Sequence, residues 1–156
     1  MCNSWMFSRM VVGYSISMCN DSRLRCSALR KAYEFRNHPK ETIFRSNQGT
    51  NYTSHEFLNL FEVLELKESK KGTPYDNAIV ESLFSNLKQD DLNYRILNTR
   101  RELEETVANY VEYYNNFRTH ETLKFKTPLQ FEDEYYKNKI RHKKSDAFNI
   151  AIFQTE

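Results

Sequence analysis

The order in which short strand-like runs and longer helical runs follow one another constrains the fold of this chain more than any other feature. Runs rich in β-branched and aromatic residues predict strands, and apolar residues that recur with helical periodicity predict helices. Strands are predicted at 9–17, 42–46 and, in short form, 64–69; helices are predicted at 21–36, from a Thr53–Glu56 capping box onward, at 76–90 and at 99–116. This order indicates an α/β domain in which helices pack on a sheet.

Composition restricts the classes to which the chain can belong. Its 156 residues fit one domain, and a net charge of +2 is too small to indicate nucleic acid by itself. Three cysteines without a C-x-x-C pair and four scattered histidines do not have zinc-finger spacing, and this cysteine usage is typical of a reducing, cytoplasmic setting. No signal peptide or membrane-spanning run is recognised, so we expect no membrane partner.

The helix predicted at 76–90 presents polar side chains on one face and apolar side chains on the other. Glu81, Ser85 and Lys88 share the polar face because they are spaced at i, i+4 and i+7. Such spacing is common on solvated helices, so it leaves both a solvated face and a functional group open.

Basic segments offer a second kind of candidate site. The turn "KESKKG" contains Lys70 and Lys71, and the run "KNKIRHKK" near the C-terminus holds five cations in eight residues. Either segment is a phosphate-binding patch or a solvated stretch, and both interpretations remain open. Arg118 and His120, which flank the turn after the long helix, contact DNA or cap that helix.

Three motifs, "FRSNQGTNYTS", "GTPYDNAIVESLFSNLK" and "YVEYYNNFRTHETLKFKTPLQF", occur in this order along the chain. Together with "SRMVVGYSIS" they resemble the catalytic domain of bacterial insertion-sequence transposases of the retroviral-integrase (DDE) type. The resemblance covers 8–139 and leaves 140–156 as a basic C-terminal tail. It implies a ribonuclease-H-like fold, a mixed five-stranded sheet with helices on both faces. It also implies phosphoryl transfer on DNA by two divalent ions, Mg²⁺ or Mn²⁺, held by three carboxylates.

The resemblance also implies roles for individual residues. The third carboxylate of the family corresponds to Glu81, which is therefore the expected catalytic residue and metal ligand. The second falls at Asn47, whose neutral amide is a weaker ligand, so we expect weak or absent metal binding there. The residues expected to contact DNA are Lys88, Ser85, Gln48, Lys70, Lys71 and Arg118.

The family's first strand, which carries its first carboxylate, and most of its second strand have no recognised counterpart here. Because the first strand lies in the middle of such a sheet, segment 42–46 is expected to lose a neighbour and leave backbone groups unpaired. A strand donated by a partner chain would replace it. Three hypotheses follow. The first is a transposase-type enzyme that is catalytically defective. The second is a fragment that binds to DNA, to a full-length transposase or to another copy of itself, and the third is a non-functional remnant. No small-molecule substrate is expected.

Overall fold

The computed structural model describes residues 2–5, 7–39, 42–46, 54–68, 74–141 and 150–154. Its strands are β1 (Cys2–Trp5), β2 (Val11–Tyr14), β3 (Ile43–Ser46), β4 (Lys67–Glu68) and β5 (Ile150–Gln154), and its α-helices are α1 (Ser22–Phe35), α2 (His55–Val63), α3 (Pro74–Asp90), α4 (Arg100–Asn116) and α5 (Pro128–Arg141). Contacts divide the chain into a first unit, residues 1–7, 11–81 and 148–156, and a second unit, residues 8–10 and 82–147.

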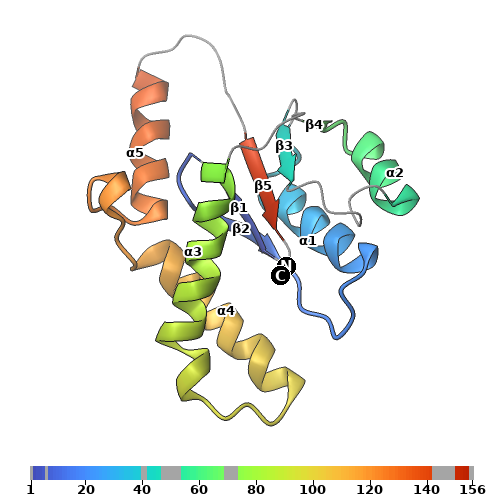
Figure 1. Ribbon diagram of the computed structural model, residues 1–156. Coiled ribbons are helices and arrows are strands. Elements are labelled where there is room, and N and C mark those ends of the chain that lie inside the picture. Colours follow the sequence, from blue (N-terminus) through green and yellow to red (C-terminus); the bar gives the residue numbers. More distant parts are fainter. Residues whose placement is uncertain are drawn as a thin grey trace. The chain divides into compact units, whose positions relative to one another are not determined.

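The first unit is built on a mixed five-stranded sheet of order β2-β1-β5-β3-β4. β1 is antiparallel to β2 and to β5, whereas β3 is parallel to β5 and to β4. Figure 1 shows β5, the red strand from the C-terminal end of the chain, between β1 and β3. The sheet is mixed, as the sequence predicts, but it has five strands, whereas the prediction for this chain lacked the family's first strand and most of its second.

Two features of this sheet differ from the prediction. Neither β1 nor β5 was expected as a strand, because "CNSW" lacks an alternating pattern and "IAIFQ" is short. The expectation that β3 loses its central neighbour is also wrong, since β5 pairs with it from Ile43↔Ile150 to Ser46↔Phe153. The chain supplies this neighbour itself.

Helix α1 begins at a side-chain cap and packs on the sheet. Asp21 accepts a hydrogen bond from the backbone N–H of Leu24 at 3.0 Å, which satisfies a donor that the first turn leaves unpaired. The helix contacts β1 and β2, and its buried side chains are Leu24, Arg25, Cys26, Ala28, Leu29 and Ala32. Helical periodicity predicted this apolar face.

Helix α2 packs its aromatic side chains on β3. The rings of Phe57 and Phe61 lie 5.6 and 5.1 Å from the ring of Phe44, measured between centroids. The cap of this helix differs from the prediction: the hydroxyl of Ser54, one residue after Thr53, accepts from the N–H of Phe57. Adjacent Thr and Ser residues are both good caps, so local sequence did not distinguish them.

The second unit consists of helices joined by short turns. Helix α4 begins at a Thr99–Glu102 capping box, where the sequence predicts the start of a helix at 99–116. α4 contacts α5, and Tyr110 and Tyr114 are buried on it. Thr127 and Gln130 exchange backbone-to-side-chain hydrogen bonds at the start of α5. Over the residues that the structure describes, no helix is long and apolar enough to cross a membrane.

Candidate nucleic-acid interface

The solvent-facing side of α3 carries the site residues that the sequence placed on one helix face. Val80, Leu83 and Leu87 are buried, with exposed fractions of 0, 4 and 7%. Glu81, Ser85, and Lys88 are exposed on the same helix. The division between a buried apolar stripe and an exposed polar stripe confirms the predicted orientation of these side chains. α3 therefore presents a carboxylate and an ammonium group, two turns apart, to solvent.

Other predicted site residues lie outside the described residues. They are Asn47, Gln48, Lys70 and Lys71. Their roles as an altered metal-ligand position and as DNA contacts stay predictions.

Arg118, a predicted DNA contact, forms an ion pair within the second unit. Its Nη1 donates to Oδ2 of Asp90 at 2.9 Å, and the hydroxyl of Tyr110 donates to the same oxygen at 3.3 Å. Burial raises the pKa of the Tyr110 hydroxyl above its ordinary value, so it remains protonated and able to donate. Asp90 thus joins the end of α3 to α4 and to the turn after it, a structural role that sequence analysis did not assign to Asp90.

His120 lies in the same part of the second unit. Its ring meets the ring of Tyr114 edge-on, with 4.9 Å between centroids, and its Nε2 has no hydrogen-bond partner among the described residues. Burial, followed by the positive charges of Arg9 and Arg118, lowers the pKa of His120 to about 4. The imidazole is therefore neutral at neutral pH and packs as an aromatic side chain. The C-cap of α4 is Phe117 and not His120, and the predicted DNA contact of His120 stays a prediction.

A buried polar pair ties the short segment 8–10 to α5. Glu132, 5% exposed, accepts a hydrogen bond from the hydroxyl of Ser8, which is fully buried. The backbone N–H of Met10 donates to the Ser8 hydroxyl at 3.3 Å. A buried carboxylate that is hydrogen-bonded in this way stabilises the packing of the two segments. The pair spans 124 positions in the sequence, so no local pattern identified it.

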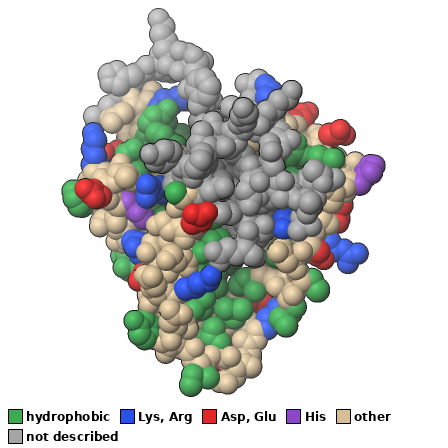
Figure 2. All heavy atoms as spheres, viewed as in Figure 1, with side chains coloured by type: hydrophobic (Ala, Val, Ile, Leu, Met, Phe, Trp, Pro, Cys, Tyr) green, Lys and Arg blue, Asp and Glu red, His purple; other side chains and the backbone are tan. Residues whose placement is uncertain are grey.

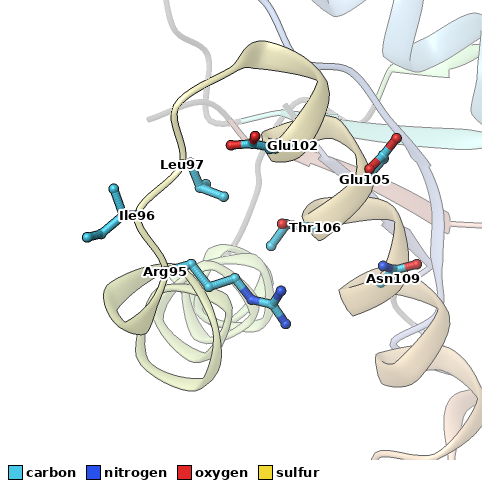
Figure 3. Close-up of a pocket in the computed structure, with 7 residues that line it drawn as sticks. All are labelled: Arg95, Ile96, Leu97, Glu102, Glu105, Thr106 and Asn109. Atoms are coloured by element: carbon cyan, nitrogen blue, oxygen red, sulfur yellow. The ribbon is translucent and has the colours of Figure 1, made fainter.

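Two shallow clefts lie between α4 and the segment that follows α3. The larger, of about 360 Å³, is lined by Arg95, Ile96, Leu97, Glu102, Glu105, Thr106 and Asn109. Figure 3 shows the side chains of Leu97 and Thr106 facing each other and that of Ile96 pointing away. The charged lining groups are matched within the protein: Arg95 pairs with Asp91, and Glu105 pairs with Arg101 at 2.8 Å. The cleft therefore offers a ligand little uncompensated charge.

Hydrophobic side chains are exposed around these clefts. Figure 2 shows them gathered at the lower end of the view, where Figure 1 draws α4 and the turn before it. Tyr94, Ile96, Tyr113 and Phe117 are exposed, and the rings of Tyr113 and Phe117 stack at 6.5 Å. Nothing in the structure shows what covers them.

Comparison with known proteins identifies the class of this domain. Residues 63–128, which include α3, α4 and the turn that carries Arg118 and His120, match the family described as an integrase core domain. Within this class, the chain has the integrase core of an insertion-sequence transposase, as its relatives show. The resemblance predicted from the motifs is thereby confirmed, and an integrase core implies a ribonuclease-H-like fold.

Two of the relatives are transposases, each from a different bacterium. The chain is 34% identical over 131 residues to the transposase for insertion sequence element IS904 of Lactococcus lactis, an alignment that covers 81% of this chain and 51% of the relative. It is also 34% identical over 132 residues to transposase InsF for insertion sequence IS3A of Escherichia coli, covering 83% of this chain and 46% of the relative. The chain thus spans about half the length of the curated relatives that it matches.

A further relative carries a different name. A Lactococcus lactis protein called an ATP-dependent protease is 32% identical over 144 residues, covering 90% of this chain and 46% of the relative. A phosphate-binding P-loop needs two glycines five positions apart followed by lysine. The three glycines here are Gly13, Gly49 and Gly72, so this stretch of sequence contains no such loop.

Among the residues that the structure describes, no complete metal site is formed. Integrase cores generally use a divalent metal ion. Within the described ranges, no three His, Cys, Asp or Glu side chains gather into a group that would hold one. β1, β2, β3 and β5 contain no acidic residue, and the only one on a strand is Glu68 of the edge strand β4. Hard cations need several oxygen ligands, which Glu81 alone does not supply.

Proposed function

We propose that this chain is a DNA-binding integrase core of an insertion-sequence transposase whose phosphoryl-transfer site is incomplete. The observation that carries the proposal is the exposed Glu81–Ser85–Lys88 face of α3 within the segment that matches the integrase core. In this proposal Glu81 is the retained third carboxylate, and Lys88 and Ser85 contact DNA phosphates. Gln48, Lys70 and Lys71 are further proposed contacts.

The proposed catalytic defect follows from the lack of carboxylate ligands for the metal ions. In-line phosphoryl transfer by two metal ions needs carboxylates that would hold the ions, because the ions stabilise both the attacking and the leaving oxygen. At position 47 the sequence has an amide, and the central strand β5 has the uncharged sequence "IAIFQ". The core proposed for 8–139 is therefore a partial one, without the family's first strand and most of its second among these residues. We expect Mg²⁺ and Mn²⁺ to bind weakly or not at all.

The proposed partners are DNA and other copies of a transposase. Arg118 is a further DNA candidate, and its guanidinium pairs with Asp90 at 2.9 Å. Self-association or association with an intact transposase would make the chain an inhibitory subunit of a mixed assembly. The exposed aromatic side chains Tyr113 and Phe117 are consistent with such contacts.

Fluorescence anisotropy with a labelled DNA duplex tests the proposal. We expect the logarithm of the affinity to fall linearly with the logarithm of salt concentration between about 50 and 200 mM, because phosphate contacts release counterions. Lys88→Ala should reduce that slope by about 1. Arg100→Ala is the matched control, since Arg100 is an exposed helical cation that pairs with Glu104 on α4. Binding that is absent, or that does not respond to salt, would overturn the proposal.

A further inference from the structure

The strand at the centre of the sheet is the last strand in the sequence. β5 pairs with β1 in antiparallel register, from Cys2↔Gln154 to Trp5↔Ala151, and with β3 in parallel register, from Ile43↔Ile150 to Ser46↔Phe153. In Figure 1 it lies between strands that come from the first third of the chain. The middle of the sheet is thus closed by a segment that is distant in sequence from both neighbours.

Without β5 the sheet would separate into two small pieces. One is the β1–β2 hairpin, and the other is the β3–β4 pair, which is joined only at Ile43↔Lys67 and Phe44↔Glu68. Among the described strands, β5 is the one that joins them. Its loss would leave unpaired backbone N–H and C=O groups along both facing edges, and two-stranded pieces are marginal by themselves.

The sequence of β5 suits a strand that has neighbours on both sides. "IAIFQ" contains two β-branched residues and one aromatic residue, and it has no charge, proline or glycine. These residue types are enriched in strands, and charge or proline would be typical of a protected edge strand instead. The composition and the observed pairing therefore agree.

We propose that the space between β1 and β3 is a strand-binding slot, that its occupant is the C-terminal segment Ile150–Gln154, and that the slot also accepts this segment as a separate peptide. The pairing is formed by backbone hydrogen bonds, as in peptides that add a strand to a sheet. Covalent connection to the rest of the chain raises the local concentration of the strand. The proposal concerns the sheet alone and does not depend on DNA binding.

Amide hydrogen exchange of the unmodified chain is the first test. A strand paired on both sides directs its N–H groups alternately to its two neighbours. We therefore expect the amides of Ile150–Gln154 to exchange at rates similar to those of β1 and β3, which also have a strand on each side. Exchange of 150–154 at the rate of an unstructured peptide would overturn the proposal.

Complementation by a peptide is the second test. Ile152→Pro removes an N–H from the middle of β5, where the register pairs Ile152 with Ser4 and with Arg45. The full-length variant should lose protection in β1, β3 and β5, and a synthetic peptide of residues 148–156 should bind to it saturably and restore the protection. Ile152→Val, which keeps the N–H and the β-branch, should behave as the unmodified chain does.

The peptide that carries the same I152P change is the control for non-specific binding, and it should neither bind nor restore protection. If the unmodified peptide does not bind the Ile152→Pro chain, the proposal that the slot accepts a separate peptide is wrong. This holds whether that chain is folded or unfolded. The exchange measurement on the unmodified chain still decides whether β5 occupies it.

Discussion

At the scale of single residues, Asp90 shows how a position with no motif can organise the surroundings of a predicted site. Its Oδ2 accepts from both Arg118 and Tyr110. Because Arg118 is about one quarter exposed and Asp90 about one half exposed, at 27 and 46%, solvent screens the pair. Arg118→Ala should therefore lower the free energy of unfolding in urea by about 1 kcal/mol.

The control for this prediction is Arg101→Ala, which removes a more exposed pair with Glu105 on the surface of α4. It should cost roughly 0.3–0.5 kcal/mol. If both variants had the same stability as the unmodified chain, the Asp90 contacts would not hold this region together. Loss of DNA affinity without loss of stability in Arg118→Ala would restore Arg118 as a primary DNA contact.

His120 makes the stability of the chain depend on pH in a defined direction. Its pKa is about 4 in the folded chain and about 6.5 when unfolded, so between these values the unfolded chain binds the proton. The free energy of unfolding should therefore be highest above pH 6.5 and fall as the pH drops toward 4.

Urea unfolding at several pH values checks this dependence. His120→Asn should flatten the decrease between pH 6.5 and 4, because it removes the titrating group. Equal slopes for the unmodified chain and His120→Asn would contradict the burial of a neutral imidazole.

At the scale of elements, β2 and α1 approach each other most closely at Gly13. A Cβ at this position would lie 2.6 Å from the backbone nitrogen of Ala32 and 2.8 Å from the carbonyl oxygen of Ala28. Backbone atoms of a helix do not move aside as a side-chain tip would, so Gly13→Ala should cost about 1–3 kcal/mol. Thermal unfolding followed by circular dichroism measures the loss; Ser17→Ala, at an exposed position nearby, should change stability by less than about 0.5 kcal/mol.

Elements whose signals are local were predicted well, and those that depend on a distant partner were not. Asp21 and the Thr99–Glu102 box mark helix starts within a few residues, and periodicity identified the buried face of α3. β1 and β5 are short, and they pair with each other across nearly the whole length of the chain. The exposed orientation of Glu81 was predictable because helical periodicity is a local signal. β5 was not predictable because its pairing partners are distant in sequence.

At the scale of the whole molecule, sheet closure and catalytic competence are separate properties. β5 supplies the central pairing that an α/β sheet needs, but it brings no carboxylate to the middle of the sheet. The account therefore predicts a sheet that closes, an α3 face that binds DNA, and a metal-ligand set too small for phosphoryl transfer.

The most direct test of this central claim is to measure binding and cleavage of the same labelled DNA in one sample, with Mg²⁺ or Mn²⁺ present. Anisotropy should show salt-dependent binding, while a denaturing gel should show no cut or joined strand. Glu81→Gln should leave the absence of cleavage unchanged, because the proposed site is already incomplete. Metal-dependent cleavage that disappears in Glu81→Gln would contradict the account.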